Sequence, residues 1–600
     1  MTGAGWRREA DVVVVGSGAA GISVALTAAA AGLRVLVVTK DLVGGATPLA
    51  QGGLAAALVA GDTAAAHVSD TLVAGAGLCE PDIVAALADG APGAIGWLTG
   101  LGARLETRDL RLEGGHSARR IVHSGDDATG AEVHRTLLAA LLTSGIEILD
   151  RTVALDLLLS DAGEADGAGT GTGARAARGT AAANAGPAGP LVRELVPARL
   201  VTGLAAAFIG ADLRLTPGVI SARAVVIAAG GLGQAFGVTS NPAGATGDGI
   251  AAAARAGAVI RDLEFVQFHP TVLWLPDASG QCPLITEALR GAGAVLRDLD
   301  GTPLMAGHDP RGDLAPRDVV AARMAAVIGR GFADAGHVWL DATALGRDLL
   351  ENGFPTVTAA CRKHGIDPVT ELIPVAPGAH YSCGGILADL DGRTSLPGLY
   401  AAGEAASTGV QGANRLASNS VTEAVIAGRR AGAAIAASLS AAPAVAAGSP
   451  PRVAGVTARA ATPAQNARRA AAHAAGGAES PGSGAAARRF ALAQAMSRYA
   501  GVIRDGDGLA RLLRTIAETG DEPVSIEALS SAHDPAGLDL EAVEAANLRV
   551  VSVLIAVGAR RRKESRGCHR RSDAADTAAA PWHTLARWDG HRLTMTQEAL

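Results

Sequence analysis

The sequence predicts an α/β fold in which a parallel-sheet domain is interrupted by a mixed α+β segment and followed by a C-terminal helical bundle. Strand-like apolar runs that end in glycines occur near residues 15, 227 and 400, which indicates one sheet assembled from separate segments. Between them, residues 262–378 mix strand and helix patterns. Residues 487–600 carry apolar side chains at three- and four-residue spacing, the period of packed helices.

The first element is a βαβ unit, "DVVVVGSGAAGISVALTAAAAGLRVLVVTK", at residues 11–40. Its turn is a G-x-G-x-x-G motif of the Rossmann type: Gly16 permits the tight turn, Gly18 lets a pyrophosphate approach, and Gly21 allows the helix to pack closely. The helix N-terminus adds amides and a positive dipole for phosphate. The second strand ends in Thr39-Lys40, where an acidic residue would grip the ribose of NAD(H). The unit therefore predicts a Rossmann-like dinucleotide domain that does not hold NAD(H) tightly.

The remaining elements divide the chain into segments. We expect the nucleotide domain at 1–261, interrupted by a disordered Gly/Ala/Pro-rich loop at about 161–190, and resumed at 379–437. The inserted domain spans 262–378. An Ala/Pro/Gly-rich linker at 438–486 leads to the helical domain at 487–600.

Composition excludes several classes of protein. A net charge of −6 over 600 residues gives no electrostatic reason to bind nucleic acid or an anionic membrane. The five cysteines contain no C-x-x-C pair, which argues against a disulfide framework, a zinc site or an iron–sulfur cluster, and we expect no metal. The N-terminus runs from charged residues straight into a strand, so we expect a cytoplasmic protein. The arginine run at 559–573 lacks interleaved aromatics, which favours domain docking over a nucleic-acid patch.

Ordered motifs along the chain resemble one family. They are "AQGGLAAAL", "ATGDGIAAAARAGA", "LEFVQFHPT", "LITEALRG", "LAPRDVVAAR", "GAHYSCGGI", "LYAAGEAASTGVQGANRLASNS" and "RRRKESRG". In these motifs the chain resembles the succinate dehydrogenase and fumarate reductase flavoprotein family, and within it the L-aspartate oxidases. The resemblance implies an FAD-binding domain, a capping domain for the insertion, and FAD as cofactor.

The resemblance also implies which residues hold FAD. The set is Gly16, Ser17, Gly18, Ala19, Ala20, Gly21, Thr39, Lys40, Thr47, Gln51, Gly52, Gly53, Asp248, Glu404, Ser418 and Asn419. Glu404 is expected at a ribityl hydroxyl, and Ser418 and Asn419 begin a helix whose dipole favours a reduced flavin. Ser418 also fits the simpler role of a helix N-cap. Membrane-complex relatives carry a flavin-linked histidine where this chain has Ala46, so we expect non-covalent FAD.

A four-carbon dicarboxylate needs a binding group at each end, and the resemblance assigns both. His269 and Thr286 are expected at one carboxylate, and His380 and Arg415 at the other. Arg317 is expected to donate or accept the proton, although a guanidinium normally stays protonated. In "RLEGGHSARR", Glu113 is expected to bind the substrate ammonium.

One departure concerns the segment Gly291-Ala292-Gly293, where relatives often read Gly-Glu-Gly. It removes a carboxylate through which a proton relay could pass, next to Arg290, which is expected in the same cluster as Arg317.

The implied reaction is oxidation of L-aspartate to iminoaspartate, with O2 reduced to hydrogen peroxide or fumarate to succinate. Its product would feed quinolinate and NAD biosynthesis, with quinolinate synthase as an expected partner. Two alternatives stay open: a flavoprotein subunit of succinate dehydrogenase or fumarate reductase, and a flavin-binding scaffold without turnover.

Overall fold

The computed structural model describes residues 6–125, 127–161, 199–276, 280–329, 336–441, 481–518, 539–589 and 592–600. Beyond Asp161, the loop predicted at about 161–190 lies outside these ranges, as do residues 442–480 of the predicted linker. The two ends of that linker prediction, 438–441 and 481–486, belong to helices α12 and α14.

The central sheet has the strand order β6-β2-β1-β9-β8-β7, with β18 also beside β9. Pairing is parallel among β6, β2, β1, β9 and β18, and antiparallel for β7–β8 and β8–β9. The α/β prediction is therefore confirmed, and β18 pairs with β9 although the paired residues are 174 positions apart in the sequence. The strands are β1 (Trp6–Val15), β2 (Val35–Val38), β6 (Glu147–Leu149), β7 (Thr152–Asp161), β8 (Arg199–Ile209), β9 (Leu215–Ile227) and β18 (Leu399–Ala401).

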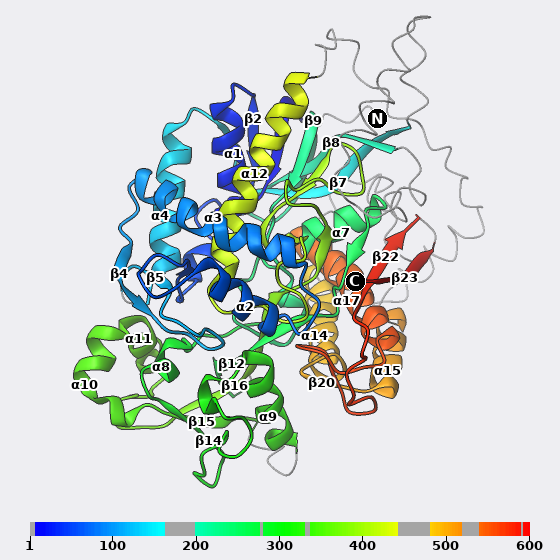
Figure 1. The fold of residues 1–600 in the computed structure, drawn as a ribbon. Helices are drawn as coiled ribbons and strands as arrows, with labels where there is room; N and C mark the ends of the chain where they lie inside the picture. Colours follow the sequence, from blue (N-terminus) through cyan, green and yellow to red (C-terminus); the bar gives the residue numbers. More distant parts are fainter. Residues whose placement is uncertain are drawn as a thin grey trace, which may run out of the picture.

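Helices from distant parts of the chain cover this sheet. α1 (Ala19–Ala30) and α12 (Asn419–Ala441) lie side by side, as the blue and yellow helices in Figure 1 show. Gly428 of α12 packs so closely on α1 that an added Cβ would lie 2.4 Å from the Ala20 carbonyl oxygen. α4 (Thr129–Thr143) also packs on α1. The start of α12 is thereby brought next to the glycine-rich turn.

The inserted segment has its own mixed sheet and core. Its strands are β10 (Val238–Thr239), β12 (Val266–Leu273), β13 (Gly280–Gln281), β14 (Val295–Arg297), β15 (Val338–Asp341) and β16 (Ile373–Ser382). Helices α8 (Ala288–Gly291), α9 (Arg317–Gly329) and α11 (Pro355–Lys363) accompany them, and apolar side chains such as Leu296, Val338 and Ile373 are fully buried among them. The green part of Figure 1 shows this unit below the main sheet. Antiparallel pairing of β12 with β16 brings the two histidine motifs together.

A separate small sheet has the strand order β3-β5-β4. It consists of β3 (Leu54–Ala55), β4 (Glu106–Arg111) and β5 (Ile121–His123), and its apolar side chains share a core with α3 (Pro81–Gly100), which packs on α2 (Ala64–Ala74). The loop between β4 and β5 carries the "EGGHS" motif. Its position is therefore set at both ends by paired strands.

The C-terminal region contains the predicted helices and an additional hairpin. α14 (Pro481–Tyr499), α15 (Gly506–Glu518) and α17 (Leu540–Arg561) pack on one another. The chain then forms β22 (Trp582–Trp588) and β23 (Leu593–Ala599), and β22 pairs with β11 (Ile260–Arg261). The hairpin was not predicted; "WHTLARW" does carry the two-residue alternation of a strand. Within the described ranges, α17 alone has the length and hydropathy to cross a membrane, and 67% of its most apolar window is buried inside the protein.

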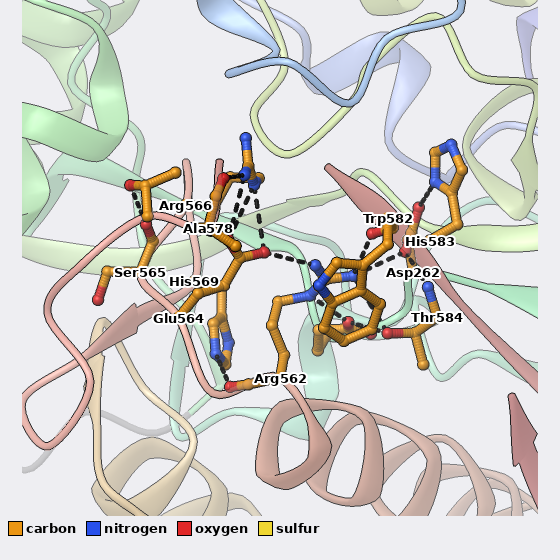
Figure 2. A network of polar contacts seen from close by, with 12 residues as sticks. Asp262, Arg562, Glu564, Ser565, Arg566, His569, Ala578, Trp582, His583 and Thr584 are labelled. Atoms are coloured by element: carbon orange, nitrogen blue, oxygen red, sulfur yellow. Dashed lines mark hydrogen bonds and ion pairs between the residues drawn. The ribbon is translucent and has the colours of Figure 1, made fainter. Parts of the chain in front are cut away.

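The arginine run after α17 is directed inward. Arg562 is fully buried and pairs with Asp262 (3.2 Å), Glu264 (2.8 Å) and Glu564 (2.7 Å). Its guanidinium carbon lies 3.9 Å from the centre of the Trp582 ring. Figure 2 shows Arg562 and Trp582 within this network of polar contacts. The network connects the C-terminal domain to the start of the inserted segment, which agrees with the docking role expected for this run.

Candidate active site

A single cavity collects nearly all the predicted site residues. The exceptions are Gly21 and Asn419, which do not line it. Three stretches of chain form most of its wall, residues 15–53, 228–317 and 380–424, and Glu113, Thr152 and Ala154 complete it. The elements that meet there are the glycine-rich turn, the strand pair β12–β16, and the starts of α9 and α12.

One end of the cavity is built for close approach to backbone. Gly16 has φ +112°, and an added Cβ would lie 2.2 Å from the Ala228 carbonyl oxygen. An added Cβ on Gly21 would lie 2.0 Å from the Gly16 carbonyl oxygen, so Gly21 serves packing instead of lining the cavity. The Ala19 N–H in the first turn of α1 donates to the Thr47 hydroxyl (3.1 Å). This end has the shape and the amide donors that a pyrophosphate requires.

Two of the predicted cofactor-binding residues, Lys40 and Asp248, form an ion pair. Lys40 Nζ lies 2.7 Å from the Asp248 carboxylate and 2.6 Å from that of Glu544 on α17. The Asn547 side chain donates to Asp248 as well (2.8 Å). Burial would lower the pKa of Lys40, but these two carboxylates outweigh it and raise the pKa. The pair forms part of the cavity wall and ties it to the C-terminal domain.

At the other end of the nucleotide region, Ser418 occupies a strained position. It has φ +59°, which is uncommon for a non-glycine residue, and it directly precedes α12. Its hydroxyl accepts from the Gly53 N–H (3.0 Å) and donates to a Glu113 carboxylate oxygen (2.6 Å). The Asn419 side chain instead bonds to His67 (2.7 Å) and Thr71 on α2, away from the cavity.

Polar atoms directed at this region fit a flavin. Gln51 lines the cavity, and its buried Oε1 has no hydrogen-bond partner among the described residues. The Glu404 carboxylate accepts from the Ser382 N–H (3.0 Å), and burial raises its pKa to about 7. A carboxyl group near neutrality can exchange hydrogen bonds with a ribityl hydroxyl. The residues present therefore fit FAD.

Two arginines define the substrate end. Gln267 Oε1 accepts from both of them, at 3.3 Å from Arg317 and 3.1 Å from Arg415. Arg415 also lies over the Tyr381 ring, with its guanidinium carbon 4.8 Å from the ring centre. Burial, together with the charge of Arg317, lowers the pKa of Arg415 to about 10. Two buried guanidiniums held this close need an anion between them.

Two histidines complete this end. The rings of His269 and His380 lie 5.1 Å apart. Burial and the neighbouring arginine charges keep the pKa of both well below the ordinary value, so both are neutral. The Thr271 N–H donates to His269 Nδ1 (3.2 Å), which places the ring proton on Nε2. That Nε2 is buried and has no partner in the described chain, so it is a donor available to a carboxylate.

Glu113 is a buried group at this end. Its exposed fraction is 4%. Burial raises its pKa, and the Glu287 charge acts in the same direction, whereas the Ser418 hydroxyl and the charges of Arg317 and Arg415 oppose the rise. Glu113 is therefore not a solvated loop charge. A cation placed beside it would stabilise its ionised form.

Sequence reasoning missed two residues of the site. Glu287 holds Arg317 (2.6 Å) and lies 3.2 Å from Arg290. Burial would raise the pKa of Glu287, but Arg317 and Arg290 outweigh burial and lower it to about 2. Gln267 is the second, because it bridges the two arginines. The available signal was position: each belongs to a motif and lies one or two residues from a predicted ligand, Thr286 or His269.

Ala292, the position where relatives often have a glutamate, lies outside the cavity. Ala292 is exposed and does not line the cavity. The carboxylate in contact with Arg317 comes from Glu287, which this chain retains. The substitution at Ala292 therefore leaves the group beside Arg317 intact.

Family models match two parts of the chain. An FAD binding domain matches residues 11–421, and the fumarate reductase flavoprotein C-terminal domain matches residues 489–600. Among solved structures, the E. coli quinol fumarate reductase FrdA is 27% identical with a TM-score of 0.76, covering 99% of this chain and 96% of its own. Mycobacterium smegmatis Sdh1 in complex with UQ1 is 28% identical with a TM-score of 0.74, covering 99% and 94%. The fold and the cavity thus define an FAD-dependent flavoprotein.

Similar curated proteins are more specific. L-aspartate oxidase of Streptomyces coelicolor is 42% identical over 98% of this chain and 93% of its own length. L-aspartate oxidases of Mycobacterium tuberculosis and Caulobacter vibrioides are 43% and 39% identical, each over 96% of this chain and covering 94% and 96% of their own lengths. The chain belongs to the L-aspartate oxidases of the succinate dehydrogenase/fumarate reductase flavoprotein family.

Proposed function

We propose that the protein catalyses the FAD-dependent oxidation of L-aspartate to iminoaspartate, with O2 reduced to hydrogen peroxide or fumarate reduced to succinate. The observation that carries this proposal is the buried Glu113 carboxylate at the substrate end of a cavity that also holds Arg317 and Arg415. Arg415 suits a carboxylate of a four-carbon acid, Arg317 suits proton transfer beside it, and the anionic Glu113 suits an α-ammonium. The identity of 39–43% to L-aspartate oxidases supports the same assignment.

Each side chain then has a defined role. His269 Nε2–H and Thr286 bind one carboxylate, and His380 and Arg415 bind the other. Glu113 holds the ammonium, which orients the Cα–H bond. Bound FAD supplies the acceptor for the hydride that leaves Cα.

Arg317 is the proposed group for proton transfer. Glu287 fixes its Nε, and Gln267 accepts from its Nη1, so the guanidinium cannot rotate away from the cavity. Oxidation of the C–N bond removes a hydride from Cα and a proton from the nitrogen. Together these are two electrons and two protons, which are taken up when O2 becomes hydrogen peroxide or fumarate becomes succinate. The retained Arg317–Glu287 pair argues for turnover and against a scaffold without activity.

The remaining assignments follow from this proposal. FAD is held non-covalently, because Ala46 offers no nucleophile for a flavin linkage. Iminoaspartate would enter quinolinate and NAD biosynthesis in the cytoplasm, with quinolinate synthase as the partner that consumes it. Acid precipitation of the holoprotein tests the first point: a yellow supernatant and a colourless pellet are expected.

The central experiment is anaerobic titration of the purified yellow protein. L-aspartate should bleach the flavin, and admission of air should restore the colour and release hydrogen peroxide. Succinate should bleach it much more slowly. Faster reduction by succinate than by aspartate would instead assign the chain to the succinate dehydrogenase and fumarate reductase subunits.

A further inference from the structure

The loop that carries Glu113 is held by a second imidazole that no role above uses. His116 follows Glu113 by three residues, and Gly115 between them has φ +85°. This turn directs the His116 side chain toward the segment before α12. His116 Nε2 lies 2.9 Å from the Ala417 carbonyl oxygen. Because a carbonyl can only accept, Nε2 carries the proton.

Arg120 fixes this tautomer from the other side. Its Nη1 lies 3.3 Å from His116 Nδ1, which must accept. Arg120 is fully buried and is anchored by Asp62 (2.9 Å) and Asp70. Burial lowers the pKa of His116 to about 4, and the Arg120 charge acts in the same direction. His116 is therefore a neutral, oriented donor at physiological pH.

The atom that His116 holds is next to the Glu113 partner. Ala417 precedes Ser418, so the His116 bond fixes the peptide that leads into the left-handed residue. A non-glycine residue keeps a strained positive φ only where several surrounding contacts hold it in that conformation. Ser418 in turn donates to Glu113 at 2.6 Å. His116 thus influences the position of the Glu113 carboxylate in two ways. It lies three residues along the same loop, and it holds the peptide before Ser418, which donates a hydrogen bond to Glu113.

We propose that His116 is a positioning residue for amine recognition: it holds Ser418 and Glu113 in the arrangement that lets the site distinguish an α-amino dicarboxylate from a dicarboxylate without the amine. This inference rests on the proposed function. His116 touches neither cavity nor substrate, and its effect on selectivity passes through Ser418 and Glu113. Arg120, Asp62 and Asp70 keep its tautomer.

The test compares two reactions in variants of the holoenzyme. His116→Phe keeps a planar ring but has no donor, and His116→Gln keeps an amide donor for the Ala417 carbonyl. His123→Phe, seven residues away on β5 and outside the cavity lining, is the matched control. The readouts are kcat/KM for flavin reduction by aspartate and kcat/KM for fumarate reduction with reduced methyl viologen, with FAD affinity and Tm alongside.

His116→Phe should lower kcat/KM for aspartate about tenfold or more, mainly through KM, because an oriented hydrogen bond to a charged group is weakened. Fumarate reduction should change by about twofold or less, and His116→Gln should recover most of the aspartate loss. In a Glu113→Gln background, His116→Phe should have little further effect on aspartate.

Equal losses for aspartate and fumarate, or an undiminished His116→Phe effect in the Glu113→Gln background, would overturn the inference. An unchanged aspartate-to-fumarate ratio in a folded, FAD-loaded His116→Phe enzyme would do the same. Failure of the proposed function looks different, because the unmodified enzyme would then not be reduced by aspartate at all.

Discussion

Substitution of Glu113 by glutamine removes one charge from the cavity and keeps its shape. The glutamine carbonyl oxygen can still accept from Ser418, whose hydroxyl lies 2.6 Å from the carboxylate in the structure. What is lost is the charge-assisted bond to an ammonium, worth about 1.5–3 kcal/mol when desolvated. At about 1.4 kcal/mol per factor of ten, kcat/KM for aspartate should fall about 10- to 100-fold.

The pH dependence gives an independent check of the same group. Because burial raises the pKa of Glu113, protonation removes its charge at a higher pH than for an exposed glutamate. In the unmodified enzyme, kcat/KM for aspartate should therefore decline as the pH falls through this raised pKa. The Glu113→Gln variant should lack that acidic limb.

The assay is stopped-flow flavin reduction by aspartate under anaerobic conditions, with fumarate reduction as the internal control. Fumarate has no ammonium, so its reduction by the Glu113→Gln variant should stay within about threefold of the unmodified rate. The reasoning is refuted if both reactions lose the same factor, or if the acidic limb for aspartate persists in the variant.

Further predictions concern the backbone and the stability of the fold. In Gly114→Ala, the added Cβ would lie 2.1 Å from Glu287 Oε1 and would displace the carboxylate that holds Arg317. The rates of aspartate oxidation and of fumarate reduction should both drop by about tenfold or more. A loss confined to aspartate oxidation would contradict this prediction. In Gly16→Ala, crowding at positive φ should abolish FAD retention, which the flavin-to-protein absorbance ratio of the purified variant measures. Burial would lower the pKa of His583, but Asp262 outweighs burial and raises the pKa from 6.5 to about 9. The protonated His583 therefore stabilises the folded state fully below about pH 6.5, and this stabilisation is lost as the pH rises through about 9. The loss is on the order of 3 kcal/mol, and denaturant unfolding of His583→Gln should show a flatter profile over that window; an unchanged slope excludes the pair as its source.

The parts of the fold that could be predicted are those that depend on residues close together in the sequence. The βαβ unit at residues 11–40 has its strand period, glycine turn and helix within one continuous stretch, so the α/β class and the dinucleotide site followed directly. Site residues inside contiguous motifs, such as His269 and Arg415, were identified because the motif places them. Their convergence on one cavity comes from β12–β16 pairing and from the packing of α12 on α1.

What could not be predicted depends on contacts distant in sequence. Glu287 has a role only because Arg317, 30 residues later, returns to it. The Asn419 side chain faces α2, because His67 and Thr71 lie there after folding. The C-terminal hairpin pairs with β11, from which it is separated by 324 to 326 residues in the sequence, so its pattern had no visible partner in the helical region. Each of these three features depends on contacts between distant parts of the chain, which the local pattern of apolar residues does not reveal.

The arrangement of arginines and glutamates at the substrate end has a consequence for charge balance. Arg290 and Arg317 pair with Glu287, Arg415 and Glu113 lie beside them, and the histidines are neutral, so these five charged side chains carry one net positive charge when both glutamates are ionised. Aspartate carries one net negative charge and neutralises this group of residues, whereas succinate and fumarate carry two and leave an excess. Without the Glu113 charge, the same wall would match a dianion. In the proposed function, this charge balance favours an amino acid over its deaminated analogue, and ionic strength should weaken fumarate binding more than aspartate binding.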